Sequence, residues 1–184
     1  GIGFNTDLAD GGQVLAFENH GTITGDAAAA ESSGVGFFEN GNDAFDVGSF
    51  VNTGTISGSG NGVDGNGGFG SFTNSGTIAG NLWQGVRAHG AVGAFTNSGT
   101  ITSEQGGGVQ FDGLVTSFSN SGTIDSERNG VTFNNGVTAG TNTGTIISRA
   151  AAGEIGVRID GPGSTFTNRG TIEGASGVAY VNST

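Results

Sequence analysis

The chain has 184 residues, of which 40 are Gly, and it carries a formal net charge of −11 with no Cys and a single Pro. With five Arg and no Lys it has few groups that contact phosphates, so nucleic acid is excluded as an expected partner. No apolar run approaches the roughly 20 residues that a membrane-spanning helix needs, so we expect no membrane span in this segment. Gly-rich chains are often flexible linkers, but the 13 Phe favour a packed core.

A seven-residue motif recurs along the chain. It reads F-T-N-S-G-T-I at 72–78 and 95–101 and F-S-N-S-G-T-I at 118–124, with looser copies at 17–23, 50–56, 140–146 and 166–172. Its central Asn returns every 22 or 23 residues through the middle of the chain, at Asn19, Asn52, Asn74, Asn97, Asn120, Asn142 and Asn168. A Val that follows a Gly stands nine residues before the first motif position at Val63, Val86, Val109 and Val131.

This period determines the expected fold class. A repeat of 22–23 residues is too short for a pair of helices. Each repeat contains three short apolar segments bounded by Gly, Asn or Ser, which suit tight corners. The sequence therefore predicts an all-β fold, a single-stranded parallel β-helix (β-solenoid) with about 22–23 residues per rung and seven to eight rungs, as one domain over residues 1–184.

Alternation within the motif predicts which side chains face the interior. Phe and Asn fall on one side of the strand, and the intervening Thr or Ser falls on the other. We expect the Phe and the Ile of successive motifs to stack as columns, at Phe72, Phe95 and Phe118 and at Ile78, Ile101 and Ile124. The repeated Asn amides should bond backbone groups or the next Asn. Gly140 stands at a Phe position, which predicts a thinner core there.

The three close copies at 72–78, 95–101 and 118–124, each with an upstream Gly-Val, resemble the passenger repeats of bacterial autotransporters and related filamentous surface proteins. The resemblance covers essentially the whole chain. It implies a secreted or cell-surface location in a Gram-negative bacterium, but not one activity, because such passengers carry adhesins, proteases, toxins and passive stalks on similar rods. We expect a non-enzymatic structural or adhesive role, with a glycan or host surface as ligand. The absence of Cys fits that setting.

The first two rungs depart from the period. Both carry six additional residues at the same corner, within 6–13 and 39–46, and these insertions are acidic. Asp10 and Asp43 occupy equivalent positions in these two rungs, so stacking of the rungs would bring their carboxylates together. We hypothesise a divalent-cation site, Ca²⁺ being the expected ion, with oxygen ligands from Asp10, Asp43 and Asp46. The alternative is a solvated acidic loop.

Catalysis is not expected. Parallel β-helices include polysaccharide lyases and hydrolases, but this chain has no Asp-Asp pair and no G-x-S-x-G elbow, and His89 is expected at the surface of a corner. A polysaccharide-binding or polysaccharide-degrading β-helix remains an alternative. So does an ice-binding solenoid, in which the outward Thr and Ser of the motif form a flat hydroxyl array. Trp83 is either an exposed contact for a sugar or protein or a packed residue.

The two ends of the chain lie at the same phase of the repeat, at G-I-G-F and at G-V-A-Y. No capping segment is evident at either end. Two interpretations follow: an excerpt of a longer rod, or a subunit that self-associates end to end into a fibre. End-to-end self-association is the expected mode of assembly.

Overall fold

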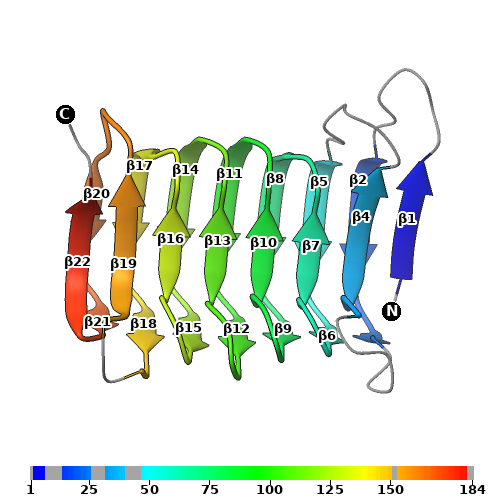
Figure 1. The fold of residues 1–184 in the computed structure, drawn as a ribbon. Coiled ribbons are helices and arrows are strands. Elements are labelled where there is room, and N and C mark those ends of the chain that lie inside the picture. Colours follow the sequence, from blue (N-terminus) through cyan, green and yellow to red (C-terminus); the bar gives the residue numbers. More distant parts are fainter. Residues whose placement is uncertain (1, 7–13, 26–31, 40–46, 151–152, 182–184) are drawn as a thin grey trace.

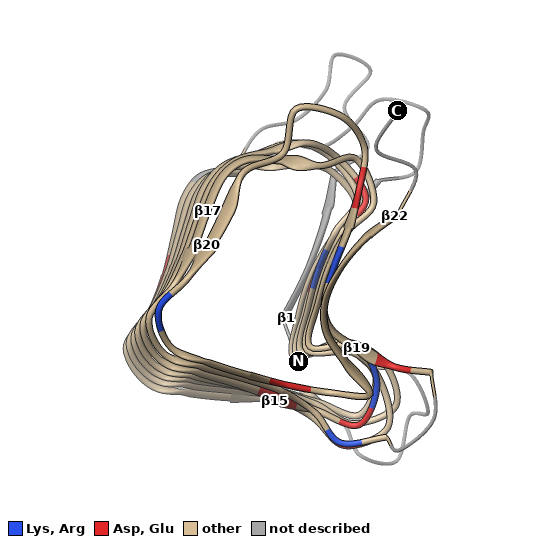
Figure 2. Cartoon of the chain, turned by 90° about the vertical axis from the view of Figure 1, so that its left-hand side faces the viewer, with Lys and Arg blue, Asp and Glu red and all other residues tan. Residues whose placement is uncertain are grey.

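The computed structural model describes residues 2–6, 14–25, 32–39, 47–150 and 153–181, and these residues form a parallel β-solenoid built of three sheets (Figure 1). The chain passes through one strand of each sheet and then steps to the next rung. The predicted fold class is confirmed. Viewed along the axis, the three sheets enclose the interior, and the outer side of one of them is concave (Figure 2).

We name the three sheets A, B and C in the order in which the chain visits them. Sheet A, the concave one, contains β1 (Ile2–Thr6), β4 (Val35–Glu39), β7 (Val63–Gly65), β10 (Val86–Ala88), β13 (Val109–Phe111), β16 (Val131–Phe133), β19 (Ile155–Asp160) and β22 (Ser176–Val181). Sheet B contains β2 (Val14–Asn19), β5 (Val47–Asn52), β8 (Phe69–Asn74), β11 (Val92–Asn97), β14 (Val115–Asn120), β17 (Val137–Asn142) and β20 (Phe166–Asn168). Sheet C contains β3 (Thr22–Thr24), β6 (Thr55–Gly58), β9 (Thr77–Gly80), β12 (Thr100–Ser103), β15 (Thr123–Ser126), β18 (Thr145–Ser148) and β21 (Thr171–Glu173).

Strand pairing reproduces the sequence period. Phe72 pairs with Phe95, Asn74 with Asn97, and Ile78 with Ile101, so each motif lies directly on its next copy. Among the described residues, sheets B and C each hold seven strands and sheet A holds eight, which fits the predicted seven to eight rungs. Adjacent parallel strands lie about 4.8 Å apart, so this pairing puts like side chains in van der Waals contact.

The repeated asparagines form one continuous ladder of side-chain hydrogen bonds. Each Nδ2 donates to the Oδ1 of the Asn in the next rung at 2.8 Å, from Asn19 through Asn52, Asn74, Asn97, Asn120 and Asn142 to Asn168. The same Nδ2 also faces two corner carbonyls; that of Asn74, for example, reaches the carbonyl oxygens of Gly76 and Thr100 at 3.3 Å. The ladder therefore satisfies the buried polar groups of the corner between sheets B and C.

The Phe column packs beside this ladder as stacked rings. Ring centroids of Phe50 and Phe72 are 4.4 Å apart, those of Phe72 and Phe95 4.8 Å, and those of Phe95 and Phe118 5.4 Å, with interplanar angles of 14° or less. Ile78, Ile101 and Ile124 are fully buried in sheet C. This apolar interior is continuous along the rod.

The core is not thinner at Gly140, contrary to the expectation from the sequence. A Cβ at this Gly would lie 2.5 Å from the Phe166 ring, so that ring already fills the missing place. The ring of Phe166 is tilted and comes within 6.1 Å of Phe118, which belongs to the rung on the other side of Gly140. Phe133 of sheet A packs against both of these rings. A neighbouring side chain thus compensates for the gap in the column.

The Gly of each Gly-Val pair is required by close packing. A Cβ on Gly85 would lie 2.5 Å from Cγ2 of Ile101, and one on Gly108 would lie 2.4 Å from Cγ2 of Ile124. A side chain at these positions would collide with the buried Ile column. This contact explains why Gly and Ile keep the same phase through the repeat.

We predict that Asn97→Ala destabilises the chain far more than Ser98→Ala. Removing the Asn97 amide leaves the Oδ1 of Asn120 and nearby corner carbonyls without a donor, and each buried unsatisfied group costs about 1–3 kcal/mol. Ser98 is the adjacent, exposed residue and serves as the control. Urea unfolding measures both free energies. Equal values for the two variants would show that the ladder does not stabilise the rod.

Candidate functional site

The outward residues of sheet A change from rung to rung, whereas the inward Asn, Phe and Ile columns of sheets B and C largely repeat. In the three-residue strands the first and third side chains point inward and are buried, and the middle one points outward. The outward residues pair directly with one another across the rungs, in the order Asp64, Arg87, Gln110, Thr132 and Arg158. Successive rungs therefore place five polar side chains of four kinds in one row.

Asp112, at the end of β13, is the centre of a polar network on this face. Its Oδ2 accepts from Nη2 of Arg87 at 3.2 Å and lies 3.1 Å from Nδ1 of His89. Its Oδ1 accepts from Gln110 at 2.8 Å and from Asn134 at 2.7 Å. Burial acts to raise the pKa of the Asp112 carboxyl, but the hydrogen bonds from Gln110, Asn134 and Arg87 outweigh it and hold the pKa below its ordinary value. Asp112 is thus a bound carboxylate and not a free acid or base.

Asp64 belongs to the same network but has fewer partners. Its Oδ2 accepts from Asn61 at 3.0 Å, and its Oδ1, which is buried without a hydrogen bond, lies 3.7 Å from Nε2 of His89. Burial raises the pKa of the Asp64 carboxyl, and the nearby His89, Asn61 and Arg87 only partly oppose this. The His89 ring therefore lies between two carboxylates, and the network balances charges of both signs.

A notch lies at the corner between sheets C and A. Two corner positions, which directly precede the Gly of the Gly-Val pair, carry Trp83 and Gln84, then Gly106 and Gly107, then Arg128 and Asn129 in three consecutive rungs. The rungs are joined there by backbone bonds from Gly85 to Gly107 at 3.1 Å and from Gly108 to Asn129 at 3.0 Å. Gly107 lines this notch and has no side chain to fill it, and a hollow of about 220 Å³ lies there.

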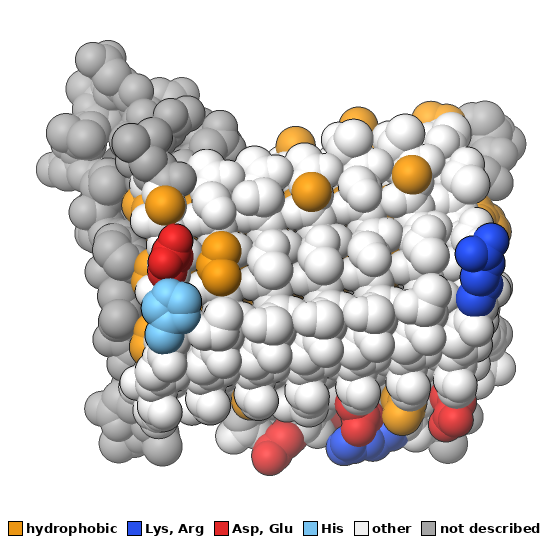
Figure 3. Space-filling model, turned by 180° about the vertical axis from the view of Figure 1, so that it is seen from behind, with side chains coloured by type: hydrophobic (Ala, Val, Ile, Leu, Met, Phe, Trp, Pro, Cys, Tyr) orange, Lys and Arg blue, Asp and Glu red, His pale blue; other side chains and the backbone are white. Residues whose placement is uncertain are grey.

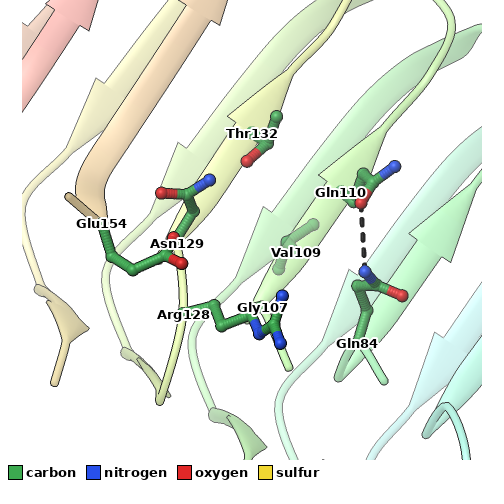
Figure 4. Close-up of a pocket in the computed structure, with 8 residues that line it drawn as sticks. All are labelled: Gln84, Gly107, Val109, Gln110, Arg128, Asn129, Thr132 and Glu154. Atoms are coloured by element: carbon green, nitrogen blue, oxygen red, sulfur yellow. Dashed lines mark hydrogen bonds between the residues drawn. The ribbon is translucent and has the colours of Figure 1, made fainter. Parts of the chain in front are cut away.

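Polar side chains surround this hollow (Figure 4). Gln84 and Gln110 lie on one side and are hydrogen-bonded to each other at 3.1 Å. Asn129 and Glu154 lie on the opposite side, while Arg128 and Thr132 close the two remaining sides. The lining thus offers donors and acceptors from every direction.

Sheet B presents the opposite kind of surface. Its outer face is even and nearly free of charge, with charged side chains only toward its two ends (Figure 3). The outward column expected from the motif is present, but it runs Val51, Thr73, Thr96, Ser119 and Thr141, so it does not repeat one hydroxyl. Ice binding on this face stays a prediction.

The structure places the other predicted residues as follows. The three candidate Ca²⁺ ligands, Asp10, Asp43 and Asp46, lie outside the described residues, so that hypothesis stays a prediction. Within the described ranges, no three acidic or His side chains gather as a metal site, and no helix is long and apolar enough to cross a membrane. Trp83 is exposed, with 48% of its surface accessible, so it is not a packed residue, and its contact with a sugar or protein stays a prediction.

Two features were missed in the sequence. The network around Asp112 was not anticipated because its members are spread over four rungs, although all except Asn61 lie one or three residues after the Val of the repeat. The notch was also missed, and its signal is the run Gly106-Gly107-Gly108, where neighbouring rungs carry large residues. Reading each outward column across the rungs would have found both.

Comparison with known proteins gave no further constraint. No protein-family model, no curated protein and no solved structure matches this chain. The functional argument therefore depends on the geometry of the solenoid itself.

We predict that Asp112→Asn lowers the melting temperature at neutral pH and that its difference from the unchanged chain narrows in acid. The folded-state pKa of Asp112 is below the unfolded value of about 3.9, so its stabilisation is present above that pH and is lost as pH falls through the folded pKa. Melting curves from pH 7 to about pH 3 measure this difference. Glu173→Gln, which removes an exposed carboxylate of sheet C, is the control. A difference that stays constant with pH would contradict the assignment.

Proposed function

We propose that the chain is a non-enzymatic structural and adhesive β-solenoid of a secreted or cell-surface bacterial protein. The observation that carries this proposal is the division between a repetitive interior and a varied concave face. Inward columns of Asn, Phe, Ile and Val are kept through most rungs, while the outward row of sheet A changes through Asp64, Arg87, Gln110, Thr132 and Arg158. Such a rigid rod with a varied face is suited to holding an extended ligand across several rungs.

The state of the ionisable groups supports a non-enzymatic role. A general acid or base needs access to the proton it transfers. Asp112 accepts hydrogen bonds from three side chains and contacts His89 as well, so its lone pairs are already occupied. Among the described carboxyls of the concave face, the pKa is shifted at Asp112 and at Asp64, and Asp64 accepts from Asn61 but keeps a buried Oδ1 without a hydrogen bond.

The resemblance of the repeats to autotransporter passengers supports the location. The surface supports it as well, because a chain with a net charge of −11 and no Lys is strongly acidic and soluble. The expected ligand is a glycan or another surface component, and a second copy of the chain is a further partner to test.

The purified chain coupled to fluorescent beads tests this proposal. Beads are applied to surfaces coated with mucin, a bacterial exopolysaccharide, a matrix protein or the chain itself. We expect saturable retention on at least one surface, competed by free chain, without release of soluble sugar fragments. Beads carrying heat-unfolded chain are the control. Retention equal to that control on every surface would refute adhesion, and release of sugar fragments would refute the non-enzymatic assignment.

A further inference from the structure

We propose that the notch around Gly107 binds one sugar residue of a neutral glycan. This inference deepens the adhesive part of the proposed function and rests on it. It identifies a binding position on the rod, its ligand class and the backbone group that receives the ligand.

The first step is that Gly107 breaks a column of corner side chains with a defined task. Asn61 and Asn129 occupy the same column, and the Oδ1 of each accepts from a backbone amide of the following rung, that of Gln84 at 2.8 Å and that of Ile155 at 2.7 Å. Gly107 has no side chain to do the same for the amide of Asn129. Among the described residues no acceptor bonds that N–H, and Asn129 lines the hollow, so we take it as a donor that a ligand oxygen can use.

The hollow is also lined by one positive and one negative side chain that form no ion pair with another described residue. Among the described residues, neither Arg128 nor Glu154 takes part in an ion pair, although both line the notch. A guanidinium donates and a carboxylate accepts, while the amides of Gln84 and Gln110 do both. A hydroxyl group also donates and accepts, so a polyhydroxylated ring matches this lining.

The third step excludes the other ligand classes. A single Val, Val109, is the apolar part of the lining, so an acyl chain or apolar peptide would gain little there. Arg128 is opposed by Glu154, and the chain carries a net charge of −11, which disfavours anions. A hollow of about 220 Å³ is smaller than the sites of about 300–1,000 Å³ that hold drug-sized molecules, as expected for one unit of a longer chain.

Trp83 extends the site along the rod. It occupies the corner position next to Gly106, whose added Cβ would lie 1.9 Å from the Trp83 carbonyl oxygen, so the two residues are immediate neighbours. Its indole is 48% exposed and offers a broad apolar surface with one N–H. The C–H face of an adjoining sugar residue can pack on it while the notch holds its neighbour.

Gly107→Asn tests the assignment because it copies the residue of neighbouring rungs. A Cβ at Gly107 meets only the Asn129 carbonyl oxygen at 3.1 Å and Gln84 Cγ at 3.9 Å, and no left-handed backbone is involved. We expect this variant to fold with an equal or higher melting temperature, because the new side chain bonds the Asn129 amide and fills the hollow. We expect its affinity for the glycan to fall about tenfold or more.

The probes are three neutral trisaccharides, maltotriose, cellotriose and chitotriose, with trigalacturonate as the anionic comparison. They are titrated into isotopically labelled chain while backbone amide resonances are followed. For at least one neutral trisaccharide we expect saturable shifts centred on Gly107, Asn129 and Gln84. Gly107→Ala, which leaves most of the hollow open, is the matched control and should bind within about threefold of the unchanged chain. Arg128→Gln, an exposed substitution, provides a second variant that should weaken binding.

Several results would overturn the proposal. These are the absence of shifts at the three amides with every neutral trisaccharide, tighter binding of trigalacturonate, or undiminished binding by both Gly107→Asn and Arg128→Gln. The outcome is separable from that of the bead experiment. Beads of the Gly107→Asn variant that are still retained would leave adhesion standing and place its site elsewhere. Trisaccharide binding by a chain whose beads are not retained would refute adhesion alone.

Discussion

Each buried strand in this chain bonds to the same strand of the next rung, and this in-register stacking decides which side chains the interior accepts. At the Asn, Phe and Ile positions of sheets B and C, most residues have their own kind above and below them. Asn can stack on Asn because its side-chain amide both donates and accepts a hydrogen bond: that of Asn74 donates to Asn97 and accepts from Asn52, each at 2.8 Å. Phe can stack on Phe because the rings lie parallel, about one strand spacing apart. The buried amides therefore need no water to remain satisfied.

The constraint explains why the fold could be predicted from the sequence. Any column that must match itself produces a period, and the Asn, Phe and Ile columns all report the same one. The period does not reveal where a side chain from one position fills the space left by a Gly at another. Phe166 leans into the space above Gly140, and Phe69 lies where a side chain on Gly65 would be, 2.7 Å from that added Cβ. Such exchanges depend on the shape of the interior, which no single column contains.

The candidate site was less accessible to sequence reasoning for a related physical reason. Outward positions have no self-matching requirement, so Asp64, Arg87 and Gln110 follow one another without any pattern along the chain. Their chemistry appears only when rungs are superposed, because His89 and Asp112 are 23 residues apart and yet 3.1 Å from each other. The sequence A-H-G therefore gave no sign of a polar network, although in the folded chain the imidazole of His89 has two carboxylate neighbours.

The same separation makes the surface of a solenoid easy to alter without loss of the rod. The Asn ladder and the apolar columns are continuous along the rod, so removing a side chain that belongs to neither leaves the interior intact. Gly107 illustrates this, since its rung keeps its backbone bonds to both neighbours while the corner loses an amide side chain. A hollow that forms because one side chain is missing requires no additional loop and no backbone strain. On a β-solenoid, a Gly in a column of large polar residues is therefore as informative for function as an unusual charged residue.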